Sequence, residues 1–207
     1  MSQLIACKSP EGIALGADSK AVDVDANGNL IEFKVERLHH LSQYTAILNG
    51  GAAAGESMCQ SLKNFIAEEN LNYVDEIHQA ALPFMATEYD RYMRRHCEVQ
   101  PIDPVHQLTF LLAGYSQRDK ANPFKLYLLW TKRKLPLLDS DEIGAAFSVP
   151  RIIRLEHELH RLTTRNAPLE EVMSVVRRGM EKQVEVNQEV SEPLQFAAIY
   201  ADGFKWV

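Results

Sequence analysis

The chain has 207 residues, of which 46% are hydrophobic and 24% are charged, and it carries a formal net charge of −6. This balance is typical of a globular domain with a substantial core, so we expect one domain over residues 1–207. The acidic balance argues against nucleic acid or an anionic membrane as a partner, because both prefer a basic surface.

The sequence also indicates where the protein resides. No apolar run reaches the roughly 18 residues of a membrane helix, and no charged start with an apolar core marks a secretory leader. We therefore expect a cytoplasmic protein with no membrane partner. The cysteines, Cys7, Cys59 and Cys97, follow no disulfide or metal-site spacing. We interpret them as buried reduced thiols, and we expect no metal and no cofactor.

The N-terminal part of the chain alternates short apolar runs with turn signals, which predicts strands joined in hairpins. Proline and glycine at residues 9–12 close the first hairpin. The pair Asn27-Gly28 closes another, because Asn-Gly is among the strongest two-residue hairpin signals. The strands expected in this part are residues 4–8, 12–18, 22–25, 29–33, 35–41 and 44–48.

From residue 53 onward the apolar residues take the spacing of amphipathic helices, which then alternate with further strands. Pro83 is expected to bend or interrupt the second helix. Asn166 is expected to cap the fourth helix, with Pro168 near its first turn. The expected elements are helices at 53–69 and 74–96, strands at 108–115, 124–131 and 142–148, helices at 151–162 and 169–186, and a strand at 194–200 followed by a tail at 202–207.

The order of these elements indicates the fold class. Strands, two helices, strands, two helices and a final strand form segregated blocks, whereas a parallel sheet needs strands and helices in alternation. The pattern favours antiparallel sheets with helices on their outer faces. We therefore predict an α+β fold, a four-layer αββα sandwich with two sheets between two layers of helices.

Several stretches of this sequence carry a resemblance to a known family. They are a strand that begins within two residues of the start, GIALGADSKA from residue 12, VERLHHL from residue 35, the Asn-Gly-Gly-Ala turn at 49–52, and the ending Ala-Asp-Gly-Phe at 201–204. Together they resemble the proteasome β-type subunits of the N-terminal nucleophile (Ntn) hydrolase superfamily, which includes the bacterial heat-shock peptidase rings. The resemblance spans nearly the whole chain and implies the same αββα fold.

The resemblance implies a nucleophile at the N-terminus. In that family a threonine at the mature N-terminus attacks the peptide carbonyl, and its own α-amine accepts the hydroxyl proton. An α-amine suits this task because its pKa of about 7.7 to 8.0 leaves a neutral fraction at cellular pH, whereas an internal amide has no basicity. Counted back from Asp18, Ser2 occupies the position of this threonine, and it supplies the hydroxyl once Met1 is removed.

The same comparison implies the supporting residues. Asp18 occupies the position of the family's aspartate, and Arg37 stands where the family has a lysine. Lys34, the nearest lysine, lies three residues from Arg37 and is expected on the other face of the strand. Gly51 occupies the position whose N–H binds the oxyanion, or Gly50 if the alignment shifts by one residue.

Three positions depart from the family pattern. Arg37 keeps a positive charge but does not deprotonate in proteins, so it cannot shuttle a proton. The family's Gly-Ser-Gly segment is Phe147-Ser148-Val149 here, and a second helper aspartate is replaced by Asn187. These departures bear on whether the site is active.

Three hypotheses about function follow from these residues. The first is a proteasome-like peptidase subunit that cleaves peptides or unfolded protein inside a homo-oligomeric ring without a cofactor. The second is an inactive structural subunit that keeps the fold and the assembly surfaces. The third is a small-molecule amidase on the same fold. The sequence does not indicate whether an ATP-dependent unfoldase is a partner.

Overall fold

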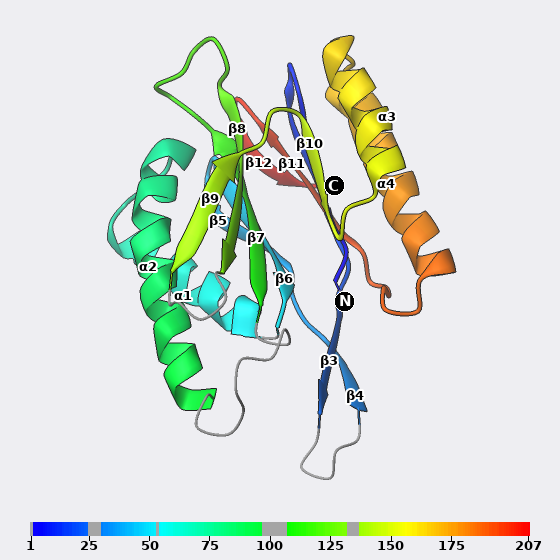
Figure 1. Ribbon diagram of the computed structural model, residues 1–207. Coiled ribbons are helices and arrows are strands. Elements are labelled where there is room, and N and C mark those ends of the chain that lie inside the picture. Colours follow the sequence, from blue (N-terminus) through cyan, green and yellow to red (C-terminus); the bar gives the residue numbers. More distant parts are fainter. Residues whose placement is uncertain (1, 25–29, 53, 97–106, 132–136) are drawn as a thin grey trace.

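The computed structural model describes residues 2–24, 30–52, 54–96, 107–131 and 137–207, and it has the predicted four layers (Figure 1). One outer layer contains α1 (Ala54–Glu68) and α2 (Val74–His96). The other contains α3 (Ile153–Thr164) and α4 (Leu169–Val186). Two antiparallel sheets lie between these layers, so the prediction of an αββα sandwich is confirmed.

The first sheet combines strands from both ends of the chain. Its order is β10-β1-β2-β11-β12, and every pair is antiparallel. The strands are β1 (Leu4–Ser9), β2 (Gly12–Ala17), β10 (Ala146–Val149), β11 (Gln195–Tyr200) and β12 (Gly203–Trp206). Strand β1 is flanked by β2 and β10. Gln3, the residue before β1, therefore lies between the ends of these two strands.

The second sheet is built mainly from the middle of the chain. Its order is β5-β6-β7-β8-β9. The strands are β5 (Leu38–Ser42), β6 (Thr45–Gly51), β7 (Leu108–Tyr115), β8 (Phe124–Thr131) and β9 (Leu138–Glu142). A separate hairpin of β3 (Lys20–Val24) and β4 (Leu30–Lys34) extends away from the sandwich (Figure 1). This hairpin was predicted, while its Asn27-Gly28 turn lies outside the described residues.

The core of the sandwich lies between the two sheets. Leu4 and Leu15 of the first sheet face Leu48 and Leu111 of the second, and all four are fully buried. Burying a leucine side chain stabilises a fold by about 1.5–3 kcal/mol. This layer therefore holds the two sheets together and fixes the position of β1.

Several predicted strand boundaries were wrong, and the strand expected at 35–41 begins only at Leu38. The single strand expected at 142–148 is divided, because β9 ends at Glu142 in the second sheet and β10 begins at Ala146 in the first. The chain crosses from one sheet to the other between them. The expected tail at 202–207 contains β12, which pairs with β11 and extends the edge of the first sheet.

Two helix predictions need correction. Pro83 does not interrupt α2, which is one helix from Val74 to His96, while the alternative of a bend at Pro83 stays a prediction. Asn166 does not cap α4: its φ of 56° is left-handed, and its N–H donates to the Thr163 carbonyl at the end of α3. The first N–H of α4 donates instead to a carboxylate oxygen of Glu11 at 2.9 Å. A residue distant in sequence thus replaces the local cap.

The described part of the chain contains no helix with the length and apolarity needed to cross a bilayer. Cys7 and Cys59 are buried free thiols, as predicted, whereas Cys97 lies outside the described residues. Burial raises the pKa of the Cys7 thiol to about 11, which makes this side chain unreactive. Within the same described residues, no group of His, Cys, Asp and Glu side chains could hold a metal ion.

Candidate active site

Ser2 lies just before β1 and is almost fully buried between the sheets. The Gly51 N–H donates a hydrogen bond of 3.1 Å to the Ser2 hydroxyl. A Cβ atom placed on Gly50 would lie 2.9 Å from the Ser2 Oγ and 3.1 Å from a methyl group of Leu4. The Ser2 side chain therefore points from the first sheet onto the end of β6 in the second.

The two glycines of this turn have different physical requirements. Gly50 leaves room for Ser2, because any side chain there would collide with the hydroxyl. Gly51 has a φ of 96°, in the region that favours glycine, and a Cβ there would lie 2.1 Å from the Gln107 carbonyl oxygen. Strand β6 ends at Gly51 and α1 begins at Ala54, so the predicted strand-to-helix turn is confirmed.

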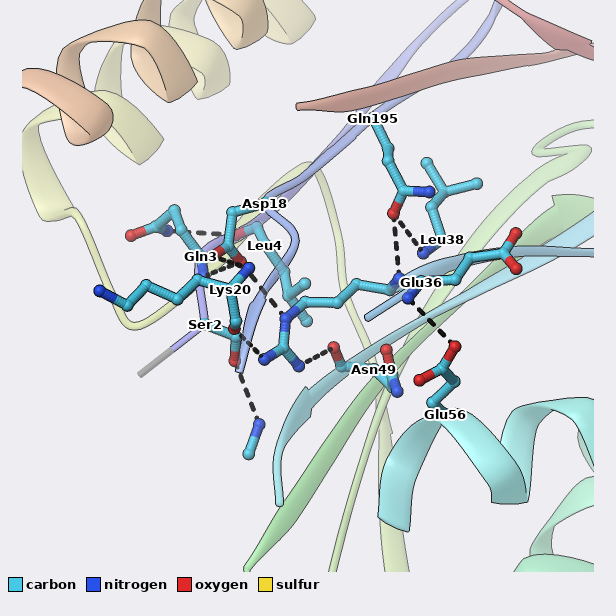
Figure 2. Close-up of polar contacts among 12 residues, drawn as sticks. Ser2, Gln3, Leu4, Asp18, Lys20, Glu36, Leu38, Asn49, Glu56 and Gln195 are labelled. Atoms are coloured by element: carbon cyan, nitrogen blue, oxygen red, sulfur yellow. Dashed lines mark hydrogen bonds and ion pairs between the residues drawn. The ribbon is translucent and has the colours of Figure 1, made fainter. Parts of the chain in front are cut away.

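Asp18 lies immediately after β2 and its side chain is fully buried. One carboxylate oxygen accepts the Gln3 N–H at 2.8 Å, and the other accepts the Lys20 N–H at 3.1 Å. Burial raises the pKa of Asp18, although these two donors and the Arg37 guanidinium oppose the rise. Asp18 thus ties the peptide after Ser2 to the start of the β3–β4 hairpin (Figure 2).

Arg37 lies in the segment between β4 and β5, and only 2% of its side chain is exposed. Its Nε atom is 3.4 Å from an Asp18 oxygen. Its two terminal nitrogens donate to the carbonyl oxygens of Asn49, at 3.3 Å, and Lys20, at 2.5 Å. Burial lowers the pKa of Arg37 and Asp18 opposes this, but a guanidinium remains charged in proteins. The result is a fixed cation beside Asp18.

Gln195 is a residue of this cluster that sequence reasoning missed. It is the first residue of β11, and its side-chain oxygen accepts the N–H groups of Arg37 at 3.0 Å and Leu38 at 3.2 Å (Figure 2). It therefore links the first sheet to the segment that carries Arg37. No sequence signal could have identified it, because it is 158 positions from Arg37 and belongs to no motif.

The residues at the other helper positions, Ser148 and Asn187, form hydrogen bonds within their own segments. The Ser148 hydroxyl donates to Glu156 at 2.6 Å and accepts the Ile152 N–H at 2.7 Å. Asn187 follows α4, and its side-chain oxygen accepts the Glu189 N–H. The Ser148 side chain thus forms hydrogen bonds at the start of α3, and the Asn187 side chain forms one just after the end of α4. Lys34 is exposed at the end of β4, but the prediction that it shares a strand with Arg37 was wrong, because Arg37 lies between β4 and β5.

The structure thus brings Asp18 and Arg37 together, and Ser2 and Gly51 together, within one αββα sandwich whose first strand begins almost at the start of the chain. This architecture is a proteasome-like fold.

A comparison with solved structures agrees with this fold. The chain is similar to Anbu (ancestral beta-subunit) from Yersinia bercovieri, with a TM-score of 0.69 over 99% of this chain and 86% of that one. The two sequences are 14% identical, so the similarity concerns the fold. No protein-family model matches the sequence, and no curated protein matches it.

Proposed function

We propose that this protein is a proteasome-like peptidase subunit in which Ser2, once Met1 has been removed, is an N-terminal nucleophile. The observation that carries the proposal is the hydrogen bond from the Gly51 N–H to the Ser2 hydroxyl. The nucleophile's oxygen is then already beside a backbone donor at the end of a strand. Gly51 is exposed, so a substrate carbonyl can approach this donor.

The proposed reaction uses the two groups of one residue. The α-amine of Ser2 accepts the proton of its hydroxyl, and the oxygen attacks the carbonyl carbon of a peptide bond. The Gly51 N–H donates to the oxyanion that forms. The C–N bond then breaks, the departing nitrogen takes the proton from the α-amine, and an ester to Ser2 remains. Water hydrolyses this ester and regenerates the hydroxyl.

Arg37 has a purely electrostatic role in this proposal. A fixed positive charge lowers the pKa of a nearby α-amine and so increases its neutral fraction. Asp18 holds the guanidinium by an ion pair and holds the backbone behind Ser2 through the Gln3 N–H. Because arginine stays protonated, every proton transfer falls to the α-amine of Ser2.

The proposal extends to the setting of the reaction. Peptides or unfolded protein are the proposed substrates, since the fold is that of proteasome-like subunits, and a homo-oligomeric ring is the proposed assembly. The buried free thiols of Cys7 and Cys59 support a reducing compartment such as the cytoplasm. No cofactor is required, because the hydroxyl, the amine and the backbone donor belong to the chain itself.

The test begins with the intact mass and N-terminal sequence of the purified protein. We expect a chain that starts at Ser2 and hydrolyses synthetic peptides. Ser2→Ala is expected to abolish hydrolysis, while Ser57→Ala, at an exposed serine of α1, is expected to retain it. Equal rates for wild type and Ser2→Ala would exclude the proposed nucleophile.

A second candidate is an inactive structural subunit. Specific observations favour it: the cation is an arginine, and the Ser148 hydroxyl is directed to Glu156. This candidate predicts a retained Met1, no hydrolysis by wild type, and the same oligomer for wild type and Ser2→Ala in size-exclusion chromatography with light scattering. The two candidates thus differ in two independent measurements, the N-terminal sequence and the hydrolysis rate.

A further inference from the structure

The outer face of α3 and α4 carries a groove that the proposed reaction does not use. The two helices lie side by side over the first sheet (Figure 1). A cavity of about 1080 Å³ lies between them, and a second cavity of about 370 Å³ continues it toward the start of α3. Both cavities are lined by Arg154, Glu158 and Arg178, which are exposed. They therefore form one surface depression, which we call the α3–α4 groove.

The α3–α4 groove is basic, although the chain as a whole has a net charge of −6. Two histidines also line it, His157 and His160, whereas the other exposed acids of α4 line neither cavity. The charged lining consists of five cations and two carboxylates, namely Arg154, Arg161, Arg165, Arg178 and Lys182 with Glu158 and Glu171. The groove is thus a positive region on an acidic protein.

Ion pairs across the groove use both of its carboxylates. Glu158 of α3 pairs with Arg178 of α4 at 2.5 Å, and Glu171 of α4 pairs with Arg165 just after α3. Within the part of the chain that the structure describes, the other three cations of the groove have no ion-pair or hydrogen-bond partner for their side chains; they are Arg154, Arg161 and Lys182. Three positive charges therefore remain without a counter-charge in one groove.

Helix stability does not account for the position of Arg154. It is the second residue of α3, where the partial positive charge of the helix N-terminus favours acidic side chains. Arg161 follows on the same face, about 10 Å further along the axis at 1.5 Å per residue. Lys182 lines the smaller cavity together with Arg154. Because like charges at such distances repel, an anion bound between them would relieve the repulsion.

The chemistry of the cations favours phosphate as this anion. The planar guanidinium group binds phosphate oxygens in pairs. A terminal phosphate group carries a charge of about −1.5 to −2 near pH 7 and three acceptor oxygens, whereas a carboxylate carries a single charge. A carboxylate ligand would compete with Glu158 and Glu171 at equal charge, while a phosphate chain would exceed them. No phenyl or indole ring is among the described residues that line the groove, so it offers no surface for stacking a base.

We propose that the α3–α4 groove binds a ligand with a chain of phosphate groups, supplied either by an inorganic polyphosphate or by a nucleoside triphosphate. Arg154 and Arg161 are its main contacts, and Lys182 adds a third from the facing helix. The groove lies on the outer side of the helices, whereas Ser2 is buried between the sheets. The proposed binding site is therefore independent of the proposed peptidase site.

The first test is isothermal titration calorimetry of the full chain with tripolyphosphate, at low salt and without divalent cations. We expect saturable binding of one ligand per chain, which weakens as salt is added because exposed charges are screened. Combining Arg154→Gln with Arg161→Gln is expected to weaken binding by about tenfold or more, since each removes charge-assisted hydrogen bonds. Glutamine is a good helix former, and circular dichroism would show that α3 is retained.

The matched control is Arg118→Gln, at an arginine that is 62% exposed in the loop between β7 and β8. It is expected to keep the wild-type affinity. Lys182→Gln, on the other helix, is expected to weaken binding by about threefold, and it keeps the test decisive if the double variant does not fold. The absence of saturable binding by wild type, or equal affinities for wild type and the groove variants, would overturn the inference.

Further ligands distinguish the source of the phosphate chain. Equal affinities for tripolyphosphate and ATP would assign the site to the phosphate chain alone, and we expect this result because the groove has no stacking surface. Tighter binding of ATP would support the site with a nucleotide as its ligand. Tighter binding of an oligoglutamate peptide than of tripolyphosphate would overturn the assignment to phosphate. None of these measurements depends on peptide hydrolysis, so failure of the groove and failure of the peptidase proposal are separately detectable.

Discussion

Two ion pairs flank the start of β1, and they differ sharply in their surroundings. On the β2 side Asp18 pairs with Arg37, and 0% and 2% of the two side chains are exposed. On the β10 side Glu156 pairs with Arg151, where 59% of the arginine side chain is exposed. Both groups of the first pair are enclosed between the sheets, whereas in the second a buried glutamate in the first turn of α3 pairs with an exposed arginine.

The difference in burial changes the balance of forces on each carboxylate. Burial raises the pKa of Asp18, because desolvation outweighs its donors and its cation. Burial also acts on Glu156, but hydrogen bonds from Arg151 and Ser148 prevail and lower its pKa. A buried pair of this kind is a weak source of stability yet holds its groups in one geometry. The Asp18–Arg37 pair thus fixes the backbone around the candidate site, and the Glu156–Arg151 pair fixes the start of α3.

Removing the arginine from each pair gives the largest expected difference between the two pairs in the free energy of unfolding. Arg37→Met leaves the Asp18 charge buried without its partner, so we expect a loss of about 3–5 kcal/mol in the free energy of unfolding. Arg151→Met removes a guanidinium that is 59% exposed and leaves Glu156 with the Ser148 N–H and hydroxyl as donors, so we expect a smaller loss of about 1–2 kcal/mol. Urea denaturation of both variants measures the two values, and similar losses would contradict the contrast.

Gln195 tests whether the geometry of the buried pair depends on the other sheet. Gln195→Ala removes the acceptor of the Arg37 and Leu38 N–H groups, so we expect a loss of about 1–3 kcal/mol. Gln195→Glu retains an acceptor and is expected to lose less. Gln60→Ala, at an exposed glutamine of α1, is the control for the substitution itself. A loss no larger than that of the control would show that this link is dispensable.

The smallest effect is expected for Glu156 of the Glu156–Arg151 pair, and it depends on pH. Because the pKa of Glu156 is lowered in the folded state, its contribution to stability is present above about pH 4.5 and is lost as the pH falls through the folded-state value. Glu156→Gln should therefore cost about 1 kcal/mol at pH 7 and less near pH 3. Denaturation curves at both pH values, with Glu158→Gln as an exposed control, measure this; a cost independent of pH would exclude the charge as its cause.

The sequence predicted the parts of the fold that depend on local patterns. Helices α2 and α4 and strands β7 and β8 have the predicted bounds, because their apolar periodicity runs uninterrupted through each element. The region from residue 138 to 149 was misread, since a short chain that changes sheets has no period of its own. The cap of α4 was misread for a related reason, because Glu11 supplies it from a distant turn.

The residues of the candidate site fall into the same two groups, those predicted by local sequence and those found only in the tertiary structure. Ser2, Asp18, Arg37 and Gly51 could be named from the sequence, because each belongs to a short stretch that resembles the family. Gln195 could not, and neither could the engagement of Ser148 by Glu156. The first contact joins β11 of the first sheet to the segment before β5 of the second, and the other joins β10 to α3, so both depend on how these elements pack together.

By itself the sequence determined the αββα architecture and the double-glycine turn, because hydrophobic period and glycine chemistry act over a few neighbouring residues. Only the tertiary structure decided which side of Ser2 is ionic and which is apolar. That division follows from β2 and β10 lying on either side of β1, with Asp18 after β2 and Phe147 and Val149 on β10. Strand order of this kind arises from packing of the whole chain, since each strand alone could pair with several others.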